Sequence, residues 1–264
     1  GYTFSDFITN TGAVAAICFV LMLAYFTLCF RKELKANEAA REGEVSCPEP
    51  STAIESKPAF LCGILVFALA VVLLITHAQT GLTVSCIGVI VAALTVIAMV
   101  ATSGTRVIPR IFRGVDYKTL LFFIGLFVSV GGLEQTGVLE VIANFISVIS
   151  GGNPYVMTAI ILILSAGCSA LIDNIPFAAT MIPVIQSLSA TTGMALPTLA
   201  WTLSLGTDIG GNATPIGASA NVVGTSVSAK NGHPISWGKY CKYCVPATVI
   251  VIMISLGCIY VRYL

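Results

Sequence analysis

The strongest constraint on this chain is that apolar runs of eighteen or more residues recur along its length. About 20 apolar residues at roughly 1.5 Å each cross a hydrocarbon core of roughly 30 Å. Only 9% of the residues are charged, whereas an average soluble domain has roughly 25%. The sequence therefore predicts an all-α polytopic membrane protein. The runs that fit a crossing are residues 12–30, 58–75, 83–101 and 245–261.

Basic residues indicate how the crossings are oriented. The net charge is +1, so the chain lacks the basic face that would neutralise nucleic-acid phosphates, and no nucleic-acid partner is expected. Twelve of the thirteen Lys and Arg residues fall in segments 31–57, 102–118 and 230–242. Short cytoplasmic loops carry an excess of Lys and Arg. We expect these three segments to be cytoplasmic, with residues 31–57 as a linker, and the C-terminus to lie outside.

The cysteines do not indicate a metal site, and the start of the chain does not indicate a signal peptide. Six of the nine cysteines lie in apolar runs, where they act as small hydrophobes. Cys241 and Cys244 form a C-x-x-C pair, but no second pair completes a zinc site. No metal site and no cofactor are expected, apart from a coupling Na⁺ or H⁺. The chain opens with Gly1, and Asp6 precedes the first apolar run without a basic residue, so we expect a fragment of a longer protein rather than a signal peptide.

Residues 119–229 contain no Lys or Arg but carry four carboxylates. Glu134 and Glu140 fall near expected interfaces, where a solvated charge is ordinary. Asp173 and Asp208 are flanked by apolar sequence. An intramembrane carboxylate costs at least ~2.5 kcal/mol unless it faces a cavity, a partner or an ion. The partner of these two aspartates is therefore expected to be a proton, a bound cation or backbone donors.

Asp173 lies between two apolar segments that we interpret as a re-entrant hairpin over residues 155–190. An Asp followed closely by Pro176 is a signal for the start of a helix. The second leg, 177–185, is short for a crossing and contains Pro183. Asp173 and Asn174 would then lie at a tip inside the membrane. The alternative is two full crossings joined by an ordinary turn.

A second interruption is the polar, glycine-rich stretch 206–221, inside a span over residues 198–229. Pro215 lacks an N–H and the glycines permit positive φ, so a helix is expected to break here and to restart near Gly217. Non-helical backbone at membrane depth is tolerated only where it is buried or lines a cavity. The alternative is a plain surface loop between two crossings.

Together, the two interruptions are expected to place two helix N-termini and several side-chain oxygens at one depth. Discontinuous-helix transporters bind an anion and a coupling cation in this way. No catalytic residue is expected. The candidate ion- or substrate-binding residues are Asp173, Asn174, Thr180, Asp208, Asn212, Thr214, Ser219 and Asn221.

Segments 169–184 and 210–223 resemble the second half of the ion transporter superfamily, in its ArsB/NhaD permease and citrate-transporter-like branch. The resemblance implies two inverted repeats, each with a re-entrant hairpin and a discontinuous helix. Residues 1–30 would be the last helix of the first repeat. Residues 58–150 would be scaffold helices of the second repeat, and 151–264 its transport part. The implied partners are a missing N-terminal repeat and a second copy in a homodimer.

One departure from the family pattern bears on the substrate. Relatives that carry dicarboxylates with sodium usually show Ser-Asn-Thr at both tips, whereas this chain has Asp-Asn-Ile at 173–175 and Ser-Ala-Asn at 219–221. An ionisable tip suits proton or sodium coupling. The sequence thus favours a secondary transporter of a small inorganic or organic anion or oxyanion, similar to arsenite or citrate permeases and coupled to H⁺ or Na⁺. A Na⁺/H⁺ antiporter of the same family is the nearest alternative.

Two other classes compete with a transporter. An intramembrane aspartyl protease would use the same two aspartates as an acid–base pair. However, the sequence from Leu205 to Asp208 matches Gly-x-Gly-Asp only loosely, and the chain has no Tyr-Asp partner. A non-transporting membrane scaffold would use the polar breaks only to shape helix packing. The protein is therefore not expected to be an enzyme.

Overall fold

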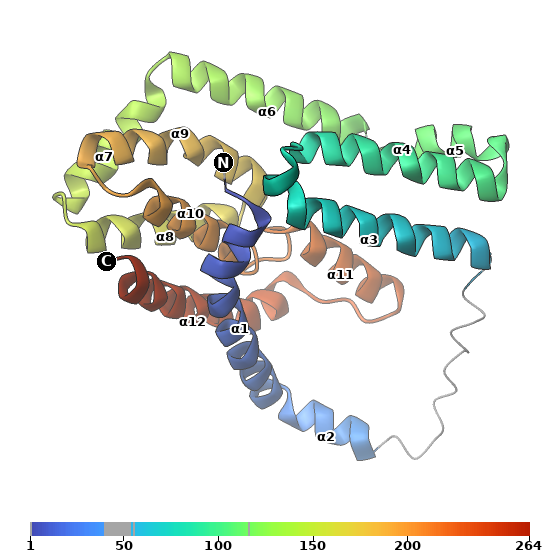
Figure 1. Cartoon of the computed structure of the whole chain (residues 1–264). Coiled ribbons are helices and arrows are strands. Elements are labelled where there is room, and N and C mark those ends of the chain that lie inside the picture. The colour runs from blue at the N-terminus through green and yellow to red at the C-terminus, as the bar shows by residue number, and fades with distance from the viewer. Residues whose placement is uncertain (1, 40–53, 55, 116) are drawn as a thin grey trace. The chain divides into compact units, whose positions relative to one another are not determined.

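The computed structural model describes residues 2–39, 54, 56–115 and 117–264. In this part of the chain the regular elements are helices, which confirms the all-α prediction (Figure 1). They are α1 (Phe4–Cys29), α2 (Arg31–Ala39), α3 (Lys57–Thr80), α4 (Val84–Ser103), η2 (Thr105–Val107), α5 (Ile108–Gly114), α6 (Tyr117–Gln135), α7 (Val138–Ser150), α8 (Pro154–Ser169), α9 (Asn174–Thr192), α10 (Leu196–Gly210), α11 (Ser219–Lys230) and α12 (Trp237–Tyr263).

Four helices are long and apolar enough to cross a membrane: α1, α3, α4 and α12. Helices α6 and α7 pass the same test as a pair, with a bend of 68° between them. The chain is a polytopic membrane protein, as the apolar runs predict. The predicted amphipathic stretch 136–150 is α7, which buries Leu139, Ala143 and Ile146 on one face.

Three helices extend well beyond the predicted segments, and the first of them, α1, begins at Phe4 rather than at residue 12. Helix α12 begins at Trp237 rather than near residue 245, because the Ser236 side chain caps it by accepting from the Lys239 N–H. Helix α9 continues through Pro183 to Thr192, although an internal proline removes one helical hydrogen bond. Val184 and Leu188 are fully buried beyond this proline. Packing of that face therefore outweighs the local cost of the proline.

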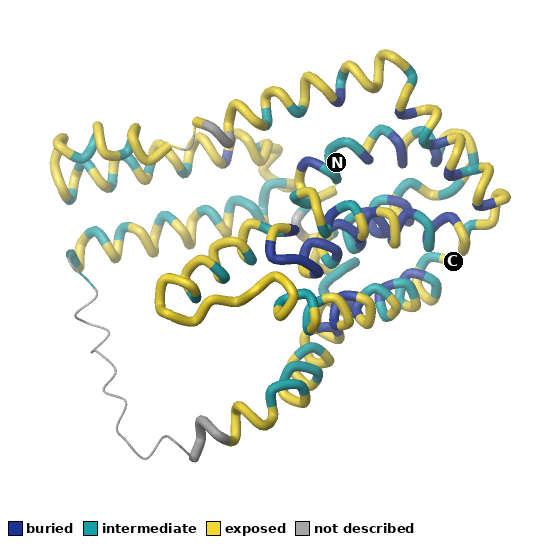
Figure 2. Tube along the Cα trace, turned by 180° about the vertical axis from the view of Figure 1, so that it is seen from behind, coloured by how far each residue is buried: buried dark blue, intermediate teal, exposed yellow. Residues whose placement is uncertain are grey.

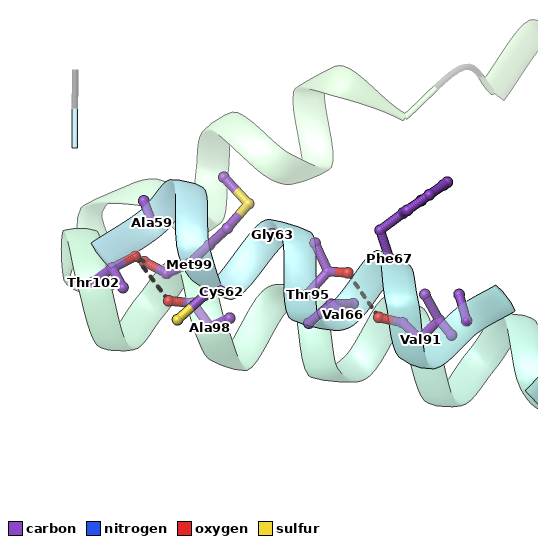
Figure 3. Close-up of a pocket in the computed structure, with 11 residues that line it drawn as sticks. Ala59, Cys62, Gly63, Val66, Phe67, Val91, Thr95, Ala98, Met99 and Thr102 are labelled. Atoms are coloured by element: carbon purple, nitrogen blue, oxygen red, sulfur yellow. Dashed lines mark hydrogen bonds between the residues drawn. The ribbon is translucent and has the colours of Figure 1, made fainter. Parts of the chain in front are cut away.

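The contacts divide the chain into two compact units, residues 1–9 with 33–118 and residues 10–32 with 119–264. In the first unit α3 and α4 pack against each other. Small residues, among them Ala59, Gly63 and Ala98, together with larger ones such as Phe67 and Met99, line an apolar groove of about 250 Å³ between them (Figure 3). The hydroxyls of Thr95 and Thr102 donate to carbonyls of their own helix. The lining therefore offers apolar surface rather than free polar groups.

The second unit holds the main core, built from α7, α8, α9 and α10. Met157, Ile161, Leu188 and Leu199 are fully buried in it, and buried segments gather on these helices in Figure 2. Helix α12 packs along α8 and α10. Its Val251 forms a smaller cluster with Val14 and Cys18 of α1.

Helices α8 and α10 make the most extensive contact in this unit. Gly206 and Gly210 of α10 face α8, and a Cβ on Gly206 would lie 2.8 Å from the Leu162 carbonyl oxygen. Glycines at such a crossing let two helix backbones approach closely, as is common between membrane helices. This close approach brings the C-terminal end of α8 next to the C-terminal end of α10, where Ser169 bonds to Thr207.

Candidate functional site

The tip of the α8–α9 hairpin starts a new helix at Asp173. Helix α8 ends at Ser169, and Asp173 is the N-cap of α9, with its Oδ1 accepting from the Ile175 N–H at 3.4 Å. Asp173 and Asn174 are both half-buried. The predicted helix start at this aspartate is therefore present.

The predicted break lies between α10 and α11, at residues 211–218. Gly211, Ala213, Thr214, Pro215 and Gly217 are buried within it. The segment is thus packed inside its unit and is not an exposed surface loop. It also starts later than the sequence indicates, because residues 206–210 stay helical against α8 and leave Asp208 in the last turn of α10.

Two side-chain hydrogen bonds join the hairpin tip to the broken helix. Asn174 Nδ2 donates to Asp208 Oδ1 at 3.0 Å, and Ser219 Oγ donates to Asp173 Oδ2 at 3.1 Å. Ser204, one turn before Asp208, donates its hydroxyl to Asp208 Oδ2 at 3.4 Å. Asp173 of the hairpin therefore contacts α11, and Asp208 of α10 contacts α9. Both links between the hairpin and the broken helix run through a carboxylate.

Thr214 and Asn221 hold the irregular backbone in place. The Thr214 hydroxyl donates to the Ala170 carbonyl of the tip. Asn221 Nδ2 donates to the carbonyl oxygens of Gly211 and Thr214, at 2.9 and 3.1 Å. These bonds tie carbonyls of the irregular backbone and of the tip to side-chain donors. The two side chains thus shape the break in this structure.

Thr180 bonds within α9, whereas Asn212, in the break, bonds back to the last turn of α10 and accepts from α12. Thr180 donates its hydroxyl to the Pro176 carbonyl at 3.0 Å, in α9. Asn212 Nδ2 donates to the Asp208 carbonyl at 3.1 Å, and the Tyr240 hydroxyl of α12 donates to the Asn212 carbonyl at 3.4 Å. Of the eight predicted residues, four are joined across the tip by bonds between side chains, Asp173, Asn174, Asp208 and Ser219, and Thr214 bonds to the backbone of the tip.

Sequence reasoning missed two residues of this network. Ser204 could have been found, because residues four apart in a helix share a face and Ser204 precedes Asp208 by four. Ser169, whose hydroxyl donates to the Thr207 carbonyl at 2.6 Å, carries no such signal. Its partner is a backbone atom 38 positions away, which only the fold brings close.

The electrostatics of the site follow from its charges and helix ends. The four-residue network carries two carboxylates, while residues 119–229 contain no Lys or Arg. Helices α9 and α11 both start at the tip, and helix N-termini carry partial positive charge and free N–H groups. Such an arrangement can hold a proton or cation at the carboxylates and an anion at the helix ends.

No group that could hold a metal is present among the described residues. In that part of the chain no three His, Cys, Asp or Glu side chains gather as ligands. Cys241 and Cys244 are free thiols. The site is therefore built from carboxylates, hydroxyls, amides and helix ends.

These features define the class: an integral membrane protein whose interrupted helices bring together a polar, acidic site, with Asp173 and Asn174 half-buried and Asp208 and Ser219 exposed. Residues 1–206 match the CitMHS family, described as citrate transporter, and the chain belongs to this family. It is 34% identical over 270 residues to an uncharacterized transporter of Mycobacterium tuberculosis, an alignment that covers 100% of this chain and 60% of the relative. A 46 kDa membrane protein of Mycobacterium leprae is 32% identical over 267 residues, with 100% and 61% coverage.

Another relative matches over a shorter stretch of the chain. The P protein of Homo sapiens is 37% identical over 147 residues, which cover 53% of this chain and 18% of that protein. No solved structure matches the chain. The chain spans about 60% of the length of the first mycobacterial relatives. The matching family and the Mycobacterium tuberculosis relative are described as transporters rather than enzymes, which agrees with the resemblance seen in the sequence.

Proposed function

We propose that the complete protein is a secondary active transporter that moves a small inorganic or organic anion, coupled to H⁺ or Na⁺. The observation that carries the proposal is the pair of bonds across the tip, Asn174 to Asp208 and Ser219 to Asp173. They bring two ionisable groups and the starts of two helices to one place. In a chain of the CitMHS family, this is the best candidate for the transport site.

Coupling follows from the charges. An anion near two ionised carboxylates is repelled, and no Lys or Arg in residues 119–229 offsets them. A proton or a sodium ion bound at Asp173 or Asp208 removes that repulsion. The helix N-termini at Asn174 and Ser219 can then attract the anion. The coupling ion therefore has to bind before or with the substrate.

The proposed substrate class is a carboxylate or oxyanion. The matching family is described as citrate transporter, which makes citrate the first compound to test. Arsenite is the second, from the resemblance of segments 169–184 and 210–223 to arsenite permeases.

The test uses the complete protein in proteoliposomes loaded to impose a proton or sodium gradient. We expect gradient-driven uptake of labelled citrate or arsenite, and a loss of about tenfold or more in Asp173→Asn and in Asp208→Asn. Glu140→Gln is the control, because Glu140 lies in the same basic-free stretch, in the first turn of α7, and outside the hydrogen bonds that cross the tip. Unchanged flux and unchanged ion dependence in both aspartate variants would contradict the assignment.

A second candidate is a Na⁺/H⁺ antiporter of the same family. The observation that favours it is the acidic network itself, which holds two carboxylates and no basic side chain to pair with an anion. Liposomes with a trapped pH indicator separate the two candidates. An antiporter acidifies or alkalinises the lumen when Na⁺ is added without any anion substrate, whereas a cotransporter requires the substrate.

We also infer the orientation from the twelve basic residues in segments 31–57, 102–118 and 230–242. These segments face the cytoplasm, the C-terminus lies outside, and the hairpin over 155–190 re-enters the membrane. A cysteine placed at Asn231 in a cysteine-free background should react with an impermeant thiol reagent only from the cytoplasmic side. A cysteine at Leu264 should react only from outside.

A further inference from the structure

Two serines of α8 offer a natural comparison. Ser165 and Ser169 lie one turn apart on the face that packs against α10, and both are 0% exposed. Ser169 Oγ donates to the Thr207 carbonyl oxygen at 2.6 Å. Ser165 Oγ has no hydrogen-bond partner within the described residues. The same side chain, equally buried, thus makes an interhelical bond at one position and none at the other.

The bond from Ser169 acts on the peptide that carries Asp208. The accepting carbonyl belongs to Thr207, so it is part of the peptide bond between Thr207 and Asp208. Near a helix end the carbonyls begin to lack helical partners. The Thr207 carbonyl also accepts from the Gly211 N–H, at a longer 3.3 Å. The hydroxyl of Ser169 therefore supplies the shorter of two bonds at this carbonyl.

Both helices of the hairpin, α8 and α9, form a hydrogen bond that holds Asp208 in place. Ser169, the last residue of α8, holds its backbone, and Asn174, the first residue of α9, holds its carboxylate at 3.0 Å. The Thr214 hydroxyl adds a third link, to the Ala170 carbonyl. A shift of the Thr207–Asp208 peptide would therefore move the carboxylate relative to Asn174.

We propose that Ser169 is a positioning residue for Asp208: its hydrogen bond to the Thr207 carbonyl sets where the Asp208 carboxylate meets the hairpin tip, and thereby sets the affinity for the coupling ion. The proposal rests on the proposed function, in which Asp208 is an ionisable member of the transport site. Ser169 does not itself touch the ion or the substrate. Its loss should change the ion dependence of transport more than its maximal rate.

The experiment compares Ser169→Ala with Ser165→Ala in the complete protein, in proteoliposomes. In Ser169→Ala we expect the ion concentration for half-maximal transport to rise about tenfold, which corresponds to about 1.4 kcal/mol of ion-binding free energy. The maximal rate should stay within about twofold. Ser165→Ala removes an unpartnered hydroxyl from the same face and should shift neither quantity by more than about twofold.

Hydrogen exchange in the same two variants reports on the position of the peptide without transport. In Ser169→Ala we expect faster exchange in residues 207–214, which include the Gly211 N–H bonded to the Thr207 carbonyl. Ser165→Ala should leave this segment unchanged. Ser169→Cys keeps a weak donor at the position and should shift the ion dependence in the same direction but less, which keeps the test usable if Ser169→Ala does not fold.

The outcomes separate this proposal from the proposed function. If the unaltered protein transports with ion dependence and both serine variants behave alike, the positioning role of Ser169 is wrong and the proposed function stands. Faster exchange in Ser169→Ala with an unshifted ion dependence also overturns it, because the bond would then be only structural. If the unaltered protein shows no ion-dependent flux at all, the proposed function fails first and the role of Ser169 fails with it.

Discussion

The α3–α4 pair and the α7–α10 core are both strongly apolar, yet they bury very different fractions of their side chains. An 18-residue stretch of α3 has a mean hydropathy of 2.9 and none of it is buried. The corresponding stretch of α4 has a mean hydropathy of 2.7, and 6% of it is buried. The core helices contain fully buried hydroxyl side chains instead, such as Thr158, Ser165 and Thr202. In lipid an apolar side chain gains little by leaving the acyl chains for another helix. We therefore expect the exposed apolar side chains of α3 and α4 to face lipid, whereas these buried hydroxyl side chains of α8 and α10 lie in the protein interior.

The largest effect expected from this difference is on core leucines. Leu188→Ala removes a side chain that is 0% exposed and packed in the main core, so it leaves a cavity and should cost about 2–5 kcal/mol. Leu65→Ala removes a side chain of α3 that is 60% exposed, so lipid can fill the space at little cost. The free energy of unfolding in bicelles, measured by SDS titration, checks both. Equal costs would show that the α3–α4 pair also has a packed interior.

The second expected effect is that replacing a glycine by alanine destabilises the protein in the α8–α10 crossing but not in α3. A Cβ on Gly210 would collide with backbone atoms of Ala166, so Gly210→Ala must separate α8 from α10 and should cost about 1–3 kcal/mol. Gly63 of α3 has nothing within 4 Å of such a Cβ, so Gly63→Ala should be neutral or stabilise the helix by up to about 1 kcal/mol. The measurement is the melting temperature of the complete protein in detergent.

The result of the glycine pair bears directly on the site. If Gly210→Ala left stability unchanged, α8 and α10 would not be closely packed. The hydrogen bond from Ser169 to the Thr207 carbonyl would then not be expected to form. Gly88→Ala in α4 is a further control, because this glycine also has open space around it.

Much of the fold could be predicted because membrane insertion depends on local composition. Spans near 58–75 and 83–101 correspond to α3 and α4, whose bounds extend the apolar runs by a few polar or capping residues. The start of α12 was missed because a cap at Ser236, not hydropathy, defines it. The length of α9 was missed because Pro183 is a local signal that tertiary packing overrides.

The site was predictable in its residue types and less so in its connections. Asp173 and Asp208 stand out as lone carboxylates in apolar sequence, and the structure places them on two elements joined across one tip. Which partner each aspartate takes depends on the α8–α10 crossing, whose register is set by Gly206 and Gly210. The role of the re-entrant hairpin and the division into scaffold and transport parts remain predictions.

The smallest expected difference is between two helix caps, one in each unit. Asn153 caps α8 by accepting from the N–H groups of Tyr155 and Val156, and Thr83 caps α4 by accepting from that of Cys86. Both caps are exposed. Asn153→Ala and Thr83→Ala should each cost about 1 kcal/mol, because a cap satisfies local backbone groups whatever the helix packs against.

Segment-resolved hydrogen exchange at the first turn of α8 and of α4 measures these two costs. Similar values would show that the two units differ in side-chain packing and not in the stability of their helix ends. A much larger cost for Asn153→Ala would mean that fraying of α8 also loosens its crossing with α10. Exchange should then rise at residues 207–214 as well. No such spread is expected from Thr83→Ala, because α3 buries no residue and α4 buries Ile87 alone.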